Sequence, residues 1–133
     1  MDILDTTFLF HYWAGDEAVR TYLADHEESD FITTAINIKE IAVGRMLQGA
    51  FDPVEIRSVF DWLTVVPFSS EAAFAAGALE ASLYRDQTVQ KDQITAPAAD
   101  VLIAGVANER NATVVTQNTA DFSQFEGITV ETY

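Results

Sequence analysis

Four acidic residues stand where the chain could build a reaction site: Asp5, Glu40, Asp100 and Asp121. Each is predicted to fall at the end of a strand or in the first turn of the helix that follows. In an open sheet of parallel strands such positions share one edge, where ligands bind. Carboxylates buried together repel one another unless a cation joins them, and a hard ion such as Mg²⁺ binds carboxylates while leaving positions for phosphate. The pattern therefore indicates metal-assisted hydrolysis of a phosphodiester.

Each of these acids also has a purely structural interpretation. Asn37 and Glu40 have the spacing of a capping box, as do Asn118 and Asp121, so both acids could serve only to satisfy backbone N–H groups. Asp100 in a first turn would suit the helix dipole. We favour the metal site because four acids converge under one topology.

The stretch from Ala96 to Phe122, APAADVLIAGVANERNATVVTQNTADF, carries two of the acids. Pro97 is expected to open a helix, because its fixed φ and missing N–H suit the first helical position, and Asp100 then lies in the first turn. The β-branched run Thr113–Thr116 predicts a buried strand, and Asn118 is expected to cap the helix that follows. The order of helix, strand and acid-bearing turn is typical of an open α/β sheet.

The rest of the chain alternates short apolar runs with amphipathic stretches. Such an alternation predicts parallel strands joined by right-handed helical crossovers, within a single domain covering residues 1–133. Asp52 and Pro53 have the types expected at the start of a helix. The other expected strands are Met1–Leu4, Phe31–Thr34, Thr64–Pro67 and Ile128–Val130, and the other expected helices lie near residues 6–13, 16–28, 35–49, 53–63 and 70–84.

The composition is that of one folded domain. The chain has 133 residues, of which 49% are hydrophobic, and it has no cysteine for a disulfide or a thiolate metal site. Its apolar runs are shorter than the 18 or so residues that a membrane span requires. The acidic N-terminus, MDILD, does not have the pattern of a signal peptide. We expect a cytoplasmic protein without a membrane partner.

The formal net charge of −14, from 21 acids and 7 basic residues, is the reverse of what nucleic-acid binders normally show. However, only Lys39 and Lys91 are lysines, and the acids are dispersed along the chain. This composition is typical of proteins from a very salty cytoplasm, where a Debye length of about 3 Å screens self-repulsion. We interpret it as halophilic adaptation, which makes net charge a poor guide to partners. The alternative is simply an acidic protein.

Four segments together resemble the motifs of the PIN domain family, especially the small toxins of the VapC type. They are LDTTFL with Asp5, ITTAINIKEIAVG with Glu40, AADVLIAGVA with Asp100, and VVTQNTADF with Asp121, spanning Ile3 to Phe122. Thr7 stands where that family usually has asparagine, and Asn37 where threonine is common.

The resemblance implies a three-layer α/β fold with a central parallel sheet of about five strands. It also implies an endoribonuclease dependent on Mg²⁺ or Mn²⁺, with RNA as substrate, a cognate antitoxin as partner and a homodimer as the assembly. Asp5, Glu40, Asp100 and Asp121 would be the catalytic acids, the first, third and fourth of them binding metal. Thr6, Thr116 and Asn118 would be supporting polar groups.

Two basic residues on the Glu40 helix, Lys39 and Arg45, are the better candidates for contact with substrate phosphate, although each could be only a surface charge. The aromatic residues of the first helix are expected to lie mostly in the core, with one or two free to dock an antitoxin helix.

Competing functions differ in the residues they require. A phosphoacceptor receiver domain needs a lysine after a late strand, and an aspartyl-phosphate phosphatase needs a second acid two residues after Asp5, where Thr7 stands. Two further alternatives stay open. One is a catalytically weak or inactive PIN-like domain that binds a protein, and the other is a housekeeping RNA-processing nuclease without an antitoxin.

Overall fold

The computed structural model describes residues 1–86 and 98–133, and within them the strands form one parallel sheet. Its order is β3-β2-β1-β4-β5, with every neighbouring pair parallel. The expected α/β sheet of about five parallel strands is thus confirmed. The strands are β1 (Asp2–Leu4), β2 (Phe31–Thr34), β3 (Thr64–Val66), β4 (Thr113–Val115) and β5 (Val130–Glu131).

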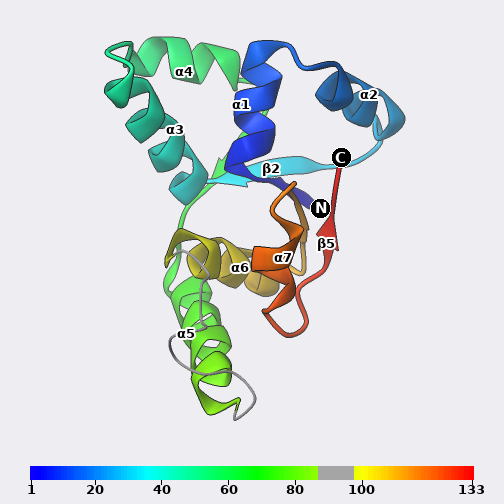
Figure 1. Ribbon diagram of the computed structural model, residues 1–133, viewed down its shortest axis with the longest axis vertical. Coiled ribbons are helices and arrows are strands. Elements are labelled where there is room, and N and C mark those ends of the chain that lie inside the picture. Colours follow the sequence, from blue (N-terminus) through cyan, green and yellow to red (C-terminus); the bar gives the residue numbers. More distant parts are fainter. Residues whose placement is uncertain (87–97) are drawn as a thin grey trace.

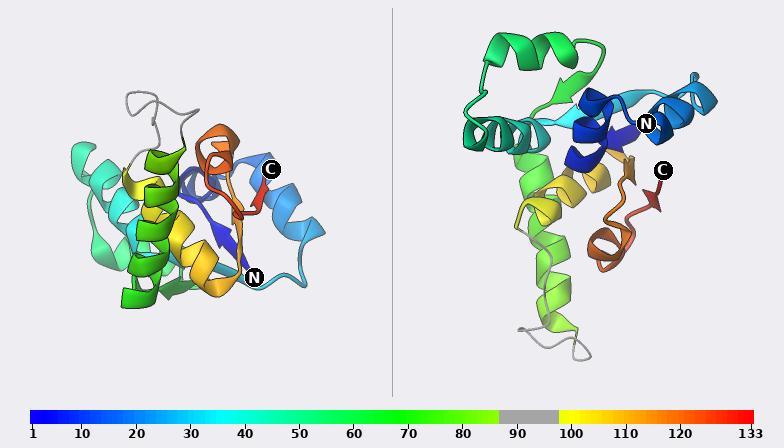
Figure 2. Two further views of the ribbon diagram at one scale, coloured as in Figure 1. Left: turned by 90° about the horizontal axis from the view of Figure 1, so that it is seen from below. Right: turned by 45° about the horizontal axis from the view of Figure 1, so that its top comes forward.

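Helices cover both faces of the sheet, which gives three layers. Figures 1 and 2 show α1 to α4 on one side of the strands and α5 to α7 on the other. Among the described residues, no helix is long and apolar enough to cross a bilayer. The helices are α1 (Thr6–Ala14), α2 (Glu17–Asp25), α3 (Ala35–Leu47), α4 (Pro53–Val59), α5 (Ser70–Arg85), α6 (Ala98–Arg110) and α7 (Thr119–Ser123).

The strand pleat divides the core into two clusters. Ile3 and Val114 point into one cluster with the inner faces of α5, α6 and α7. Leu4 and Val115, their chain neighbours, point into the other, which contains Phe8 of α1 and the inner sides of α2, α3 and α4. Successive side chains of a strand face opposite sides of the sheet, so a continuous apolar run is what a strand buried on both faces requires.

The order of the strands reverses beside β1. The chain runs from β1 outward to β3 on one side, then returns to β4 on the other side of β1. The backbone N–H of Asp5 donates to the carbonyl of Val115 at 3.1 Å, so the ends of β1 and β4 lie together. Such a reversal opens a crevice at the carboxyl ends of the strands, where α/β proteins bind ligands.

Most expected elements are present, with corrections at their ends. The last strand begins at Val130 instead of Ile128, and strands β3 and β4 each end one residue early. Asp52 caps α4 as expected, since its carboxylate accepts from the N–H groups of Val54 and Glu55. Pro97, expected to open α6, lies outside the described residues.

The expected position of Glu40 was wrong. Helix α3 begins at Ala35, so Glu40 lies in its second turn instead of its first. Its capping box also has different members from those expected. Thr34 is the N-cap and Asn37 the third helical residue, with reciprocal hydrogen bonds between them. Glu40 is therefore not needed to cap the helix, which removes its structural interpretation.

Helices α5 and α6 pack closely at Gly105. A Cβ atom at this position would stand 2.6 Å from the carbonyl oxygen of Ala72 and 2.7 Å from the Cβ of Ala76. Only glycine allows this approach, because the nearest atoms belong to backbone or to a methyl group that cannot turn away. Gly77, on α5, is different: a Cβ there meets no described atom within 4 Å.

We predict opposite effects of the same substitution at these two glycines. Gly105→Ala should reduce the free energy of unfolding by about 1–3 kcal/mol, because the two helices must move apart. Gly77→Ala should increase it by about 0.5–1 kcal/mol through lower backbone entropy in the unfolded chain. Urea denaturation of both variants measures this. Equal effects would contradict the packing described for α5 and α6.

Candidate functional site

Asp5 is buried between the ends of three elements. It follows β1 and occupies the N-cap position of α1, yet its side chain makes no capping hydrogen bond within the described residues. Instead its Oδ2 accepts from the hydroxyl of Thr116 at 2.7 Å, and its Oδ1 accepts from the side-chain amide of Asn37 at 3.1 Å. Burial raises the pKa of Asp5, while these hydrogen bonds and one from the backbone of Thr6 oppose the rise.

Glu40 is held by the first residue of α1. The hydroxyl of Thr6 donates to Glu40 Oε1 at 2.7 Å, although the two residues are 34 positions apart in the sequence. This bond fixes the second turn of α3 against the start of α1. Thr6, expected as a supporting polar group, therefore contacts one of the acids directly.

Asp100 is buried in the first turn of α6, as the sequence predicted. Burial raises the pKa of Asp100 to about 7, and the negative charges of Asp5, Asp121 and Glu40 add to the shift. Each of the other three acids thus lies within electrostatic range of Asp100. In this electrostatic sense the fold brings them to one region.

Asp121 and the residues before it lie beyond the end of β4. Asp121 is in the first turn of α7 and half-buried. Thr116 is fully buried, and besides donating to Asp5 its hydroxyl accepts from the backbone N–H of Asn118 at 3.0 Å. Asn118 occupies the N-cap position of α7, but its exposed side chain makes no capping bond to any described residue. The expected capping box of Asn118 and Asp121 is absent from this described segment.

The side-chain chemistry of the four acids suits a divalent cation better than the distances between them do. Within residues 1–86 and 98–133, no three acidic or histidine side chains stand close enough to hold one ion together. The donor set is nevertheless carboxylate oxygen, which Mg²⁺ and Mn²⁺ prefer. A cation at this edge would also offset the repulsion that raises the pKa of Asp100. We conclude that the residue types suit such an ion, and that the carboxylates must come closer to share one.

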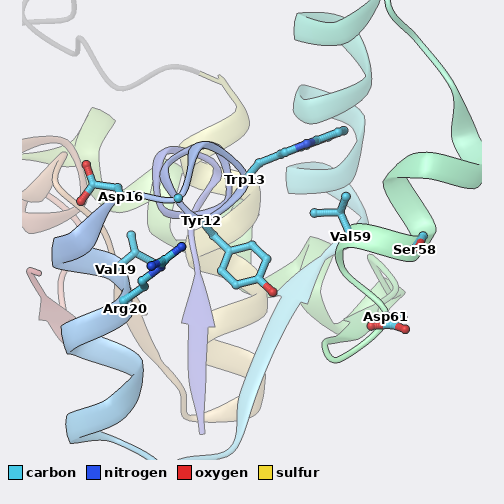
Figure 3. Close-up of a pocket in the computed structure, with 9 residues that line it drawn as sticks. Tyr12, Trp13, Asp16, Val19, Arg20, Ser58, Val59 and Asp61 are labelled. Atoms are coloured by element: carbon cyan, nitrogen blue, oxygen red, sulfur yellow. The ribbon is translucent and has the colours of Figure 1, made fainter.

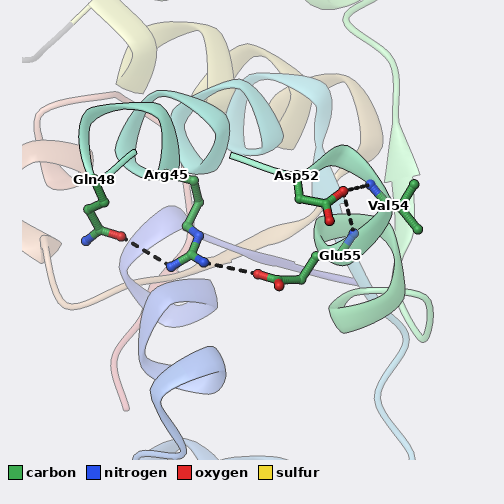
Figure 4. A network of polar contacts seen from close by, with 5 residues as sticks. All are labelled: Arg45, Gln48, Asp52, Val54 and Glu55. Atoms are coloured by element: carbon green, nitrogen blue, oxygen red, sulfur yellow. Dashed lines mark hydrogen bonds and ion pairs between the residues drawn. The ribbon is translucent and has the colours of Figure 1, made fainter. Parts of the chain in front are cut away.

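The two basic residues singled out from the sequence differ in their surroundings. Lys39 is exposed, one position before Glu40. Arg45 is already engaged, because its guanidinium donates to Glu55 at 3.0 Å and to Gln48 at 3.2 Å (Figure 4). The guanidinium also lies 4.4 Å from the ring centre of Trp13. Arg45 therefore ties α3 to α4 and α1, and contact with a phosphate would compete with this network.

A cleft in the described structure lies away from the four acids. It has a volume of about 510 Å³ and opens between α1, α2 and the end of α4. Figure 3 shows the Tyr12 ring of α1 between Arg20 of α2 and the Val59 side of the cleft, with Asp16 and Asp61 at its margins. The cleft combines aromatic side chains with exposed acids, which suits contact with a protein segment more than catalysis.

Sequence reasoning missed one residue of the site. Asn37 is fully buried and contacts both Asp5 and Thr6 through its amide nitrogen. The pairing of Asn37 with Glu40 as a capping box concealed this, since it directed the asparagine toward its own helix. The signal that could have identified it was Thr34, an N-cap type that stands three positions before Asn37 and so has capping-box spacing to it.

We predict that Asp100→Asn stabilises the protein in metal-free buffer in a pH-dependent way. Between about pH 4 and 7 folded Asp100 keeps a proton that the unfolded chain releases, so wild-type stability falls as pH rises through this window. Asparagine does not titrate. The Tm advantage of the variant should be small near pH 4, grow to a few degrees by pH 7 and then level off.

Thermal unfolding monitored by circular dichroism in EDTA measures this difference. Glu80→Gln, which removes one exposed acid from α5, is the control and should show no such growth. A constant Tm difference from pH 4 to 8 would contradict the electrostatic description of Asp100.

Several solved structures are similar in fold to this chain over almost their whole length. In the Rickettsia felis VapBC2 complex bound to promoter DNA, one chain has a TM-score of 0.77 and 20% identity, covering 99% of this chain and 98% of that one. A chain of DNA-bound VapBC from Salmonella typhimurium has a TM-score of 0.76 and 26% identity, with 98% of this chain and 96% of that chain covered. A chain of a toxin–antitoxin complex from Klebsiella pneumoniae has a TM-score of 0.69 and 18% identity, with 96% of this chain and 95% of that chain covered. No curated protein matches the sequence significantly.

The sequence itself also matches a family model. The match to the PIN domain covers residues 3–128, which include all four acids, strands β2 to β4 and all of β1 except Asp2. PIN domains are generally nucleases, so the acids at the carboxyl edge of the sheet occupy the region where hydrolytic chemistry is expected. The chain belongs to the PIN domain family.

Proposed function

We propose that this chain is a Mg²⁺- or Mn²⁺-dependent endoribonuclease that acts in the cytoplasm as the toxin of a toxin–antitoxin pair. The observation that carries the proposal is Asp100, a buried carboxyl whose pKa is raised by burial and by the charges of Asp5, Asp121 and Glu40. Acids with a purely structural role rarely accumulate in this way, whereas metal-dependent hydrolases need a group of carboxylates that lie near one another.

In this proposal each acid has a role that suits its surroundings. Asp5, Asp100 and Asp121 would hold the ion, with Asp5 kept in place by Thr116 and Asn37. Glu40, oriented by Thr6, would accept a proton from the attacking water. A bound divalent ion would lower the pKa of that water and neutralise charge on the phosphate. Lys39, exposed beside Glu40, is the better candidate for contact with RNA phosphate, since Arg45 is engaged elsewhere.

The wider composition fits the same proposal under high salt. We infer that the excess of 21 acids over 7 basic residues is an adaptation to concentrated salt, which would also screen repulsion between this surface and RNA. Assays should therefore be made in molar KCl. A homodimer is also part of the proposal, and Leu47 of α3 and Phe74 of α5, both largely exposed, are the apolar side chains that it would cover.

We predict that Asp100→Asn keeps the fold and lowers RNA cleavage by orders of magnitude. The same change should remove most of the rise in Tm that Mn²⁺ produces in the wild-type protein, because an ion that binds only the folded state stabilises it. Cleavage of a labelled RNA oligonucleotide and thermal unfolding with and without Mn²⁺ measure both effects. Glu80→Gln should behave as wild type.

Undiminished cleavage by Asp100→Asn, with contaminating nuclease excluded, would refute the assignment. Absence of both Mn²⁺ binding and cleavage in the wild-type protein would favour the alternative of an inactive PIN-like domain that binds a protein. Mapping the cleavage ends on total RNA would identify the substrate among transfer, ribosomal and messenger RNA.

The antitoxin would bind the cleft lined by Tyr12 and Trp13. Its margins carry Asp16 and Asp61, so a segment with apolar and basic side chains is complementary to it. The similar structures support a partner of this kind, since they are complexes named VapBC or toxin–antitoxin. We expect the antitoxin to be encoded beside this chain.

We predict that Asp61→Lys weakens binding of the adjacently encoded antitoxin at least severalfold, because a basic segment would then meet a like charge at the margin of the cleft. Glu80→Lys makes the same change of charge on α5, away from the cleft, and should leave affinity unchanged. Titration calorimetry with the purified antitoxin compares the two. Equal affinities would exclude the cleft, and neighbouring genes without an antitoxin would favour a housekeeping nuclease.

A further inference from the structure

Asn37 uses every hydrogen-bonding position of its buried side chain. Its Oδ1 accepts from the hydroxyl of Thr34 at 2.7 Å and from the backbone N–H of Thr34 at 3.3 Å. Its Nδ2 donates to Asp5 Oδ1 at 3.1 Å and to Thr6 Oγ1 at 3.0 Å. A buried amide with two acceptor contacts and two donor contacts is fully satisfied.

These contacts leave only one orientation for the amide. A carboxylate accepts but cannot donate, so the atom facing Asp5 must be the nitrogen. The backbone N–H of Thr34 donates but cannot accept, so the atom facing it must be the oxygen. The usual ambiguity between the oxygen and nitrogen of an asparagine amide is thus removed by its neighbours.

The orientation of Asn37 also determines the direction of the next hydrogen bond. Because Thr6 Oγ1 accepts from Asn37, its own proton is available for Glu40, to which it donates at 2.7 Å. One side chain therefore directs donors at two acids, Asp5 directly and Glu40 through Thr6. These two acids come from different elements, since Asp5 precedes α1 and Glu40 belongs to α3.

We propose that Asn37 is a positioning residue that sets the relative placement of the Asp5 and Glu40 carboxylates for metal binding and hydrolysis. Threonine or serine would offer a single donor and could not serve Asp5 and Thr6 together. Aspartate would keep the contact with the Thr34 hydroxyl but would place another carboxylate directly against Asp5. Asparagine is neutral, which matters beside acids that already repel one another. This inference rests on the proposed nuclease function.

The test separates positioning from simple stability. Asn37→Ala should weaken Mn²⁺ binding about tenfold by titration calorimetry and lower kcat for RNA cleavage by about 10–100-fold, the range typical of residues that orient metal ligands. KM for RNA should change little, because Asn37 is buried. Ser69→Ala is the matched control, since it removes the N-cap bond of α5 to Ala72 N. It should lower Tm while leaving Mn²⁺ affinity and kcat unchanged.

A double-mutant cycle tests the branch through Thr6. Thr6→Val removes the hydroxyl that joins Asn37 to Glu40 while preserving its shape. In the Thr6→Val background, Asn37→Ala should cost less in kcat than it does in the wild-type protein, because part of its effect passes through that hydroxyl. Full additivity would overturn the branch to Glu40.

The outcomes distinguish this inference from the nuclease proposal. A wild-type protein that binds Mn²⁺ and cleaves RNA, with an Asn37→Ala variant whose Mn²⁺ affinity and kcat match those of Ser69→Ala, would overturn the positioning role alone. A wild-type protein that does neither would overturn the proposed function, and this inference with it. Should Asn37→Ala fail to fold, Asn37→Ser provides the same comparison, with Mn²⁺ affinity and kcat below those of Ser69→Ala as the supporting result.

Discussion

Carboxylates gathered at the carboxyl edge of the parallel sheet repel one another, and the contacts around them must accommodate this repulsion. Burial raises the pKa of Asp100 to about 7, and the negative charges of the other three acids add to this rise. Asp5 is accommodated by neutral donors from Thr116 and Asn37. Neutral donors hold a carboxylate in place while leaving its charge for a cation, whereas a salt bridge would cancel it.

The topology brings these acids together. Strand β1 lies at the centre of the sheet with β2 and β4 on either side, so the turns that follow all three meet at one edge. Asp5, Thr34 and Thr116 come directly after or at the end of these strands. Helix α6 then delivers Asp100 to the same edge from the opposite face. Helix α6 packs tightly against α5 because Gly105 has no side chain, and this contact determines the position of α6.

Helix α1 links two surfaces with different roles. Its first turn carries Thr6, which contacts Glu40, and its last turn carries Tyr12 and Trp13, which line the cleft between α1, α2 and α4. Trp13 also lies under the guanidinium of Arg45, which is paired with Glu55 of α4. The proposed binding surface for a protein partner is thus part of the same packing that supports the acids, although the cleft itself does not include them.

Local patterns in the sequence were sufficient for the alternation of strands and helices, the cap at Asp52 and the positions of Asp5, Asp100 and Asp121 at a strand end or helix start. These features depend on near neighbours in the chain, so hydrophobic periodicity and the residue types at helix caps predict them. Glu40 was misplaced, but by only one turn. Contacts between distant residues were decided by the tertiary structure alone. Asn37 reaches Asp5 across 32 positions, and Arg45 is occupied by Glu55 and Trp13. The spacing of the acids also belongs here, because side-chain orientation follows from partners that no local pattern specifies.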